Sequence, residues 1–126
     1  MRHGYNPDTV EKPGAGYSQV VISGGLVYTS GQCARDVNLK HVGDDIETQT
    51  RQTIRNIELL LESAGCTLDD VIKVTTFLGD NSYFRGYDKV YRELFKQPYP
   101  VRTTVAVVFD DASLIEMDVV ARRPGG

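Results

Sequence analysis

VIKVTTFL, at residues 71–78, is the stretch of this sequence that decides the fold. Its β-branched and aromatic residues predict a strand, and apolar side chains fall on both alternations of that strand. A second stretch, LIEMDVVA at residues 114–121, has the same property. Because successive strand residues point to opposite faces of a sheet, we expect both faces of this sheet to be covered.

The segment before residues 71–78 has the pattern of a helix over residues 45–64. Apolar side chains recur there at helical spacing, and Gly65 follows as a typical stop. Asp44, with Glu47 three residues later, predicts a capping box at the start of this helix. The apolar stripe consists of Ile54, Ile57, Leu60, Leu61 and Ala64.

A second helix is expected over residues 81–96, because Pro98 and Pro100 bar its continuation. Aromatic and apolar side chains recur at the spacing of a core-facing side. We expect that inner side to be formed by Phe84, Tyr87, Tyr91, Leu94 and Phe95.

The remaining segments supply further strands. Gly24-Gly25 separates two β-rich runs and predicts a hairpin. Residues 1–16 read as an irregular arm and residues 32–43 as a polar loop, since both are rich in breakers and polar side chains. The strands beside residues 71–78 are expected at 18–22, 26–30, 102–109 and 114–122.

The predicted order is ββαβαββ in a single domain spanning residues 1–126. Two helices with a mostly antiparallel sheet give an α+β sandwich with both helices on one face. Helices are then missing on the other face, whose apolar residues still need a cover. A subunit interface is the cover that we expect there.

Composition excludes several classes of function. The formal net charge is -3 without a basic stripe, which argues against nucleic-acid binding. No apolar run approaches a membrane span or a signal segment, so we expect a cytoplasmic protein that binds no membrane. The cysteines and histidines lack the spacing of metal ligands or a disulfide framework. No Walker or Rossmann glycine pattern occurs, so no cofactor is expected.

Arg102 follows Pro100 at a junction between a loop and a β-branched run. A guanidinium fixed by strand geometry suits bidentate binding of a carboxylate, and an ordinary salt-bridged arginine is the alternative. Glu116 and Asp118 lie two apart on a predicted strand and therefore share a face. This pair favours acid–base or water-orienting chemistry; the alternative is a solvated face paired with Arg122 or Arg123.

Three further side chains are candidates at the ends of predicted strands. Tyr17 could present its hydroxyl to a pocket or simply pack. Ser30 could donate to a ligand, although no G-x-S-x-G elbow surrounds it. Cys33 could be a reactive thiol or a small loop residue, because no neighbouring group is evident that would lower its pKa.

Several motifs together resemble the RidA/YjgF family of reactive-intermediate (enamine/imine) deaminases. The resemblance runs over about residues 14–123 and is most diagnostic around Arg102. It implies a chorismate-mutase-like fold and trimers whose clefts lie between subunits. The motifs are Gly-Tyr-Ser-Gln at 16–19, Tyr-Thr-Ser-Gly-Gln at 28–32, Gln-Thr-Arg-Gln at 49–52, Pro-Val-Arg-Thr-Thr-Val at 100–105 and Ile-Glu-Met-Asp-Val-Val-Ala at 115–121.

The resemblance also implies roles for single residues. Arg102 matches the arginine that grips the substrate carboxylate, and Tyr17 and Ser30 match cleft residues. Asp118 stands where glutamate is usual near the hydrolytic water, and Asp88 stands where asparagine is common.

Three other positions complete the comparison with the family. Thr104 occupies a position of cysteine or threonine. Gly16 replaces the usual proline before the tyrosine, and Cys33 replaces an apolar residue. The carboxylate clamp is intact, whereas the substrate and the rate depend on these departures.

The expected activity is hydrolysis of reactive 2-imino or enamino acids, such as 2-aminoacrylate, to 2-oxo acids and ammonia. Arg102 would bind the carboxylate and Asp118 would position the water. One alternative is a deaminase specific to a pathway, acting on an aminoacrylate or aminomuconate. A second is a non-catalytic sensor of small carboxylates. An endoribonuclease is the third, and the net charge counts against it.

Overall fold

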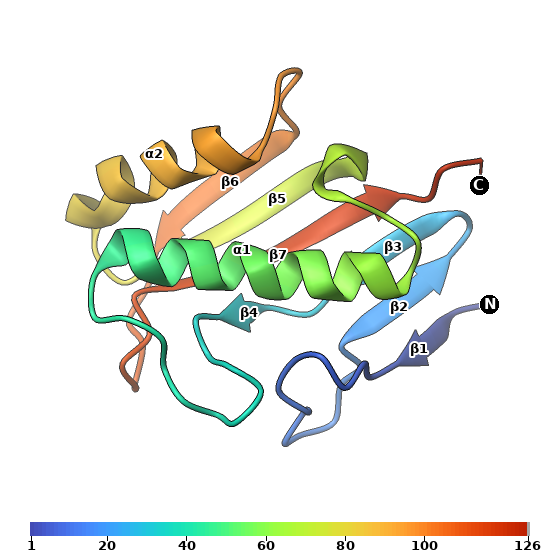
Figure 1. Ribbon diagram of the computed structural model, residues 1–126, viewed down its shortest axis with the longest axis horizontal. Coiled ribbons are helices and arrows are strands. Elements are labelled where there is room, and N and C mark those ends of the chain that lie inside the picture. Colours follow the sequence, from blue (N-terminus) through green and yellow to red (C-terminus); the bar gives the residue numbers. More distant parts are fainter. Residues whose placement is uncertain (126) are drawn as a thin grey trace.

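The computed structural model describes residues 1–125 and confirms the α+β sandwich with both helices on one face of the sheet (Figure 1). Two 3₁₀ turns, Leu68–Asp70 and Asn81–Tyr83, precede β5 and α2. The helices are α1 (Ile46–Ser63) and α2 (Phe84–Leu94). The strands are β1 (His3–Tyr5), β2 (Val20–Ser23), β3 (Leu26–Thr29), β4 (Gln32–Cys33), β5 (Val71–Leu78), β6 (Val101–Ala106) and β7 (Ile115–Arg122).

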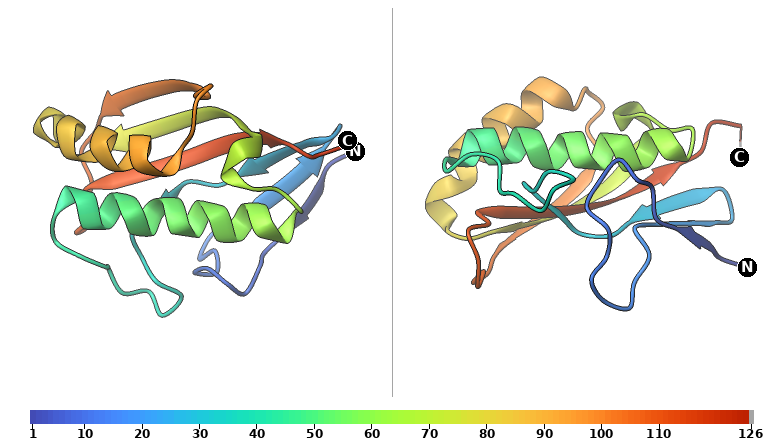
Figure 2. Two further views of the ribbon diagram at one scale, coloured as in Figure 1. Left: turned by 45° about the horizontal axis from the view of Figure 1, so that its top comes forward. Right: turned by 60° about the horizontal axis from the view of Figure 1, so that its bottom comes forward.

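The sheet has the strand order β1-β2-β3-β7-β5-β6, and β4 pairs with β7 beside this path. Only β5 and β6 are parallel, because α2 provides the crossover between them. Figure 2 shows α1 and α2 together on one side of the sheet, with the opposite side left open. We call this open side the outer face. Within residues 1–125, β6 forms one edge of the sheet and β1 the other.

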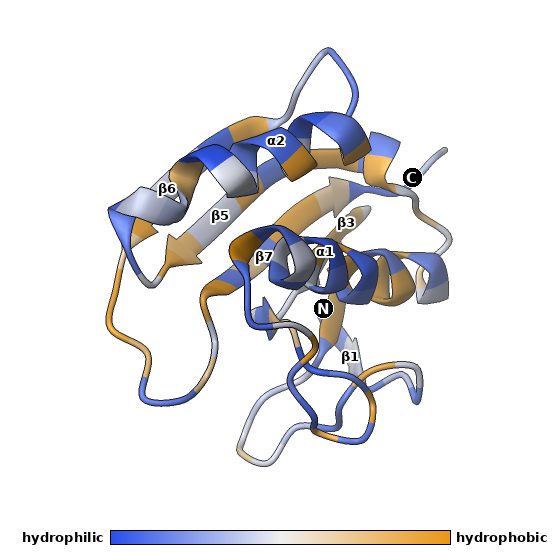
Figure 3. Ribbon diagram, turned by 60° about the vertical axis from the view of Figure 1, so that its left-hand side comes forward, coloured by the Kyte–Doolittle hydropathy of each residue, from blue (hydrophilic) through white to orange (hydrophobic). Residues whose placement is uncertain are grey.

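Helix α1 forms the larger part of the core against β7 and β3. All five residues of its predicted apolar stripe are buried, which confirms that pattern. Figure 3 shows hydrophilic colour along the outward side of α1 and hydrophobic colour on strands behind it. Gly65 follows the helix with φ 77°, a conformation that favours glycine, as the stop signal predicted. The predicted Asp44 cap is wrong: Asp45 is the N-cap, and its side chain accepts from the Thr48 amide.

Helix α2 packs its aromatic residues against the sheet with one exception. Tyr87, Tyr91 and Phe95 are buried, whereas Phe84 is exposed, so its predicted core position is wrong. Phe84 begins the helix, where the neighbouring segments cover it less. The Tyr87 hydroxyl donates to Thr76 Oγ1 on β5 at 2.9 Å and so fixes the helix over the sheet.

Two short strands were missed because their segments are polar and rich in turn formers. β1 lies inside the predicted irregular arm and pairs with β2. β4 lies at the start of the predicted polar loop and pairs with β7 at Met117 and Glu116. β6 ends at Ala106 and not at residue 109. Pairing to a neighbour, not local pattern, makes such strands, and a single sequence does not show that pairing.

The outer face carries apolar side chains that nothing covers within residues 1–125. Tyr28, Val101 and Val105 are 41%, 67% and 43% exposed. Tyr28 lies opposite Val120, and Val105 lies opposite Phe77, so these side chains share one face. The outer face therefore carries apolar residues on β3 and at the β6 edge, whereas on the central strands β5 and β7 Phe77 and Val120 share it with polar residues.

Gln49 ties the start of α1 to the loop that leads into β7. This side chain is only 1% exposed. Its Nε2 donates to the carbonyls of Gly43 and Ala112, each at 3.0 Å, and its Oε1 accepts from the Leu114 amide at 2.8 Å. The entry of β7 into the sheet thus depends on one amide side chain.

We predict that Gln49→Leu lowers the free energy of unfolding by about 2–4 kcal/mol, because it leaves three backbone groups without their partner. Urea denaturation followed by circular dichroism measures this change. Arg55→Leu, on the exposed side of the same helix, should change stability by only about 0.5 kcal/mol. An equal effect of the two substitutions would contradict the role assigned to Gln49.

Candidate functional site

Arg102 lies on the helix side of β6. It pairs with Val74 of β5, which pairs with the buried Val119 of β7. Because directly paired residues point to the same side of a sheet, the Arg102 side chain faces α2. Thr104, two residues on, shares this side, and its Oγ1 lies 3.1 Å from the Tyr87 hydroxyl.

Aromatic rings and one carboxylate hold the Arg102 guanidinium. Its Cζ lies 4.5 Å from the Tyr91 ring centre, 5.1 Å from that of Tyr87 and 5.5 Å from that of Phe84. Its Nη1 donates to Asp88 Oδ1 at 3.0 Å. Both side chains are 22% exposed, so this ion pair is sheltered but reachable. Cation–π contacts and the ion pair together keep the fork in one orientation.

Arg102, Asp88 and Tyr91 face a pocket of about 320 Å³ between α2 and the segment that enters β6. The second oxygen of Asp88 forms an ion pair with Arg92 Nε at 3.1 Å. The pocket, called the Arg102 pocket below, is lined by Asp88, Tyr91, Arg92, Tyr99, Pro100 and Arg102.

A second pocket of about 170 Å³ lies beside β4 and contains Glu116. The Cys33 thiol contacts Glu116 Oε1 at 3.6 Å. A Cβ at Gly31 would stand only 2.5 Å from Glu116 Oε2, so a glycine there lets the carboxylate approach the chain. Tyr17, which is 51% exposed, also lines this second pocket, called the Glu116 pocket below.

Hydrogen bonds among amide and hydroxyl side chains build the floor of the Glu116 pocket. Ser30 Oγ donates to Gln19 Oε1 at 2.8 Å, and Gln32 Nε2 donates to the same oxygen at 2.9 Å. The Gln19 amide nitrogen in turn donates to the Glu11 carbonyl. Ser30 therefore acts through Gln19, which sequence reasoning did not single out.

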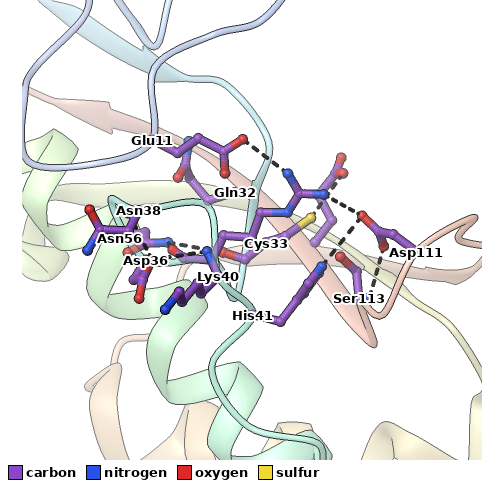
Figure 4. A network of polar contacts seen from close by, with 12 residues as sticks. Glu11, Gln32, Cys33, Asp36, Asn38, Lys40, His41, Asn56, Asp111 and Ser113 are labelled. Carbon is purple, nitrogen blue, oxygen red and sulfur yellow. Dashed lines mark hydrogen bonds and ion pairs between the residues drawn. The ribbon is translucent and has the colours of Figure 1, made fainter.

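A charged network closes the outer side of the Glu116 pocket. Arg35 bridges the Glu11 carboxylate at 3.2 Å and the Asp111 carboxylate at 2.9 Å. Figure 4 shows this network with Cys33, His41 and Ser113 nearby. Burial acts to raise the pKa of Asp111, but the hydrogen bond from the Ser113 amide and the Arg35 guanidinium together hold that pKa below its usual range. No spacing in the sequence pointed to this network, because its members come from separate loops.

Asp118 lies away from both pockets. It pairs with Thr75 in the middle of the outer face. Burial raises the pKa of its carboxyl, and Lys73 offsets part of that effect. Glu116 shares this face, as the spacing predicted, but it lies at the end of the strand where β4 and Tyr17 meet it.

The structure brings the predicted residues together in two groups. Arg102, Asp88 and Thr104 lie on the helix side of β6. Tyr17 lines the Glu116 pocket, which is built partly from the outer face, and Ser30 is linked to that pocket through Gln19. Within one chain, the guanidinium and the Glu116 carboxylate therefore project to opposite faces of the sheet.

Residues 1–125 contain neither a cluster of metal ligands nor a membrane-spanning helix. No group of three or more histidine, cysteine or acidic side chains there could hold a metal ion. None of the helices in this range is long and apolar enough to cross a membrane.

Comparisons with known proteins identify relatives of this chain. The family model described as endoribonuclease L-PSP matches residues 9–123. The mitochondrial protein mmf2 of Schizosaccharomyces pombe is 45% identical over 94 residues, which cover 74% of this chain and 73% of that protein. The human 2-iminobutanoate/2-iminopropanoate deaminase is 32% identical over 117 residues, which cover 90% of this chain and 85% of that protein.

A solved structure, that of YEO7_yeast, superimposes with a TM-score of 0.93 at 29% identity. The superposition covers 98% of this chain and all of that one, and it agrees with the chorismate-mutase-like α+β fold that the resemblance implied. The family includes a protein named as an imine deaminase. On these matches, the chain belongs to the RidA/YjgF family, whose model carries the description endoribonuclease L-PSP.

Proposed function

We propose that this protein hydrolyses small 2-imino acids to 2-oxo acids and ammonia. The observation that carries this proposal is the Arg102 guanidinium, which three aromatic rings and Asp88 hold in one orientation at a pocket. A fixed fork binds a carboxylate bidentately and thereby fixes the adjacent imine carbon. The name of the human relative, an iminobutanoate and iminopropanoate deaminase, supports the same substrate class.

The proposed reaction needs a water and a group that takes its proton. Water adds its oxygen to the imine carbon and a proton to the nitrogen; ammonia then leaves as the carbonyl forms. A carboxylate is a suitable base for the water. Glu116 is the better candidate for this role, because Tyr17 lies at its pocket and Asp118 lies away from it. Asp118, which the family resemblance favoured, stays as the alternative.

In this proposal the clamp, Arg102, and the base, Glu116, must come from neighbouring subunits, because within one chain they project to opposite faces of the sheet. A homotrimer, as the resemblance implies, would bring the β6 edge of one subunit to the Glu116 pocket of the next. Exposed Tyr28, Val101 and Val105 supply apolar surface for such an interface. The pockets would then be two halves of one cleft between subunits.

The first prediction concerns the clamp. Arg102→Ala should abolish imine hydrolysis at a cost of roughly 2–5 kcal/mol in transition-state binding, because it removes a charge-assisted pair. Arg102→Lys should restore little, since a point charge cannot reproduce the fork. Ammonia release from freshly generated 2-iminobutanoate, with circular dichroism as a check of the fold, measures both. Near-normal activity of the alanine variant would rule out the clamp.

The second prediction separates the two carboxylates. Glu116→Gln should lower kcat by about 10²–10⁴ with little change in ligand affinity, because it removes the base and keeps the shape. Asp118→Asn is the matched control on the same strand and face, and its kcat should stay within a few-fold of normal. The reverse order would assign the water to Asp118.

The third prediction uses Cys33 as a reporter on Glu116. Burial raises the pKa of this thiol to about 11, and the neighbouring Glu116 charge contributes to the rise. In a Cys66→Ala background, the rate of iodoacetamide reaction should therefore keep rising up to about pH 11. Glu116→Gln should lower that pKa, though not to its ordinary value, because burial remains. An unchanged profile would mean that the carboxylate does not act on the thiol.

The fourth prediction concerns assembly. The full chain should sediment as a trimer at micromolar concentration, because apolar side chains on the outer face need a cover. Tyr28→Glu should shift the equilibrium toward monomer, whereas Arg55→Glu, on the exposed side of α1, should not. A stable monomer of the unsubstituted chain in sedimentation equilibrium would contradict the proposed cleft between subunits.

A further inference from the structure

The substrate and the product of the proposed reaction differ in one charge. A protonated 2-imino acid is a zwitterion, with a carboxylate and a cationic nitrogen on adjacent carbons. The 2-oxo acid keeps the carboxylate, but a neutral carbonyl oxygen replaces the nitrogen. A site that recognises the cationic nitrogen would therefore bind the substrate more tightly than the product.

The Arg102 pocket contains a pair of opposite charges at the spacing that such a zwitterion needs. Asp88 Oδ1 lies 3.0 Å from Arg102 Nη1, so an anionic and a cationic group stand side by side at the pocket wall. A ligand whose two charged groups are on adjacent carbons can contact Arg102 and Asp88 at the same time. A ligand that carries only a carboxylate meets Asp88 as a like charge.

Asp88 is held so that it faces the ligand as an acceptor. Its Oδ1 accepts from Arg102 Nη1 at 3.0 Å, and its Oδ2 forms an ion pair with Arg92 Nε at 3.1 Å, so two cations orient the carboxylate. Of the Arg102 nitrogens, Nη1 has this carboxylate as its partner among residues 1–125, and Nη2 has no hydrogen bond there. One edge of the fork can thus take a carboxylate while Asp88 stays in place.

The chemistry of an acid differs here from that of an amide. An ionised carboxylate only accepts hydrogen bonds, whereas an amide can also donate to a carbonyl. Asp88 can therefore accept from an iminium N–H and offers no donor to the carbonyl of a 2-oxo acid. Pairing a buried charge only with the correct ligand is a common source of specificity.

We propose that Asp88 and Arg102 together form a recognition site for 2-iminium zwitterions, called the reader below. In this site, Asp88 determines specificity by binding the cationic nitrogen. This inference rests on the proposed function. It predicts that the protein takes the protonated imine and discriminates against the 2-oxo acid that it produces. Asp88 is a specificity residue in this account, and Glu116 remains the base.

Alanine and pyruvate are stable probes that test the reader without turnover. They share a carbon skeleton and a carboxylate, and only alanine carries a cationic nitrogen. Titration calorimetry or ligand-observed NMR at pH 7 gives their affinities for the full-length protein. We expect alanine to bind at least about tenfold more tightly than pyruvate, as a charge-assisted hydrogen bond provides.

Asp88→Asn should reduce this preference to about two-fold or less, because it should weaken the binding of alanine and strengthen the binding of pyruvate. Asp88→Glu, which keeps the charge, should retain a preference for alanine. Glu93→Gln is the matched control: it removes the same charge from α2, where Glu93 pairs with Arg51 and lies outside the pocket. Circular dichroism shows whether the variants fold.

Arg102→Ala separates failure of the inference from failure of the proposed function. If it weakens both probes while Asp88→Asn leaves their ratio unchanged, the reader is overturned and the clamp stands. If Arg102→Ala changes the affinity for neither probe, or if neither probe binds the unsubstituted protein, both proposals are contradicted. A ratio that falls equally in Glu93→Gln would assign the effect to net charge and overturn the reader.

Discussion

The pleat of the sheet is the constraint on which the rest of the structure depends. Adjacent strands pair so that Arg102, Val74 and Val119 point toward the helices. The same alternation sends Glu116 and Asp118 to the outer face. A shift of one residue in the pairing of β6 would turn Arg102 to the outer face. The alternation of side chains along β6 and β7 therefore separates the proposed clamp from the proposed base within one chain.

The two pockets hold their charged side chains, Arg102 and Glu116, in place by different contacts. Around Arg102, aromatic faces and Asp88 surround a guanidinium and keep it oriented, so little entropy is left to lose on binding. Around Glu116, the chain approaches closely because Gly31 has no side chain. The Cys33 thiol lies against that carboxylate, and burial with the nearby charge raises the pKa of the thiol. A thiol with so high a pKa stays neutral at pH 7 and adds no charge beside Glu116.

Much of the fold could be predicted from the sequence because the long elements have strong periodic patterns. The apolar stripe of α1 and the two-sided β5 and β7 stretches came from spacing alone. Short β1 and β4 could not be predicted, since pairing with β2 and β7 creates them. The helix cap was placed one residue early, because Asp44 and Asp45 are both good capping residues.

The site was harder to predict than the fold. Arg102 stood out because a proline and a β-branched run fix its position. Asp88 came only from the family resemblance, although the structure pairs it with Arg102. Gln19 and Arg35 carry no sequence signal, as their partners come from distant loops. Spacing showed that Glu116 and Asp118 share a face, but only the path of β4 shows which of them lies in a pocket.

Mixing of two inactive variants tests the central claim, a site shared between subunits, most directly. Arg102→Ala and Glu116→Gln chains, co-expressed with different tags and purified as mixed assemblies, should regain imine hydrolysis. In a mixed cyclic trimer, about one cleft in three would combine an intact clamp with an intact base. Activity near a third of normal in the mixed assemblies, with none in either variant alone, is the predicted result. Mixed assemblies as inactive as their parents would contradict the account.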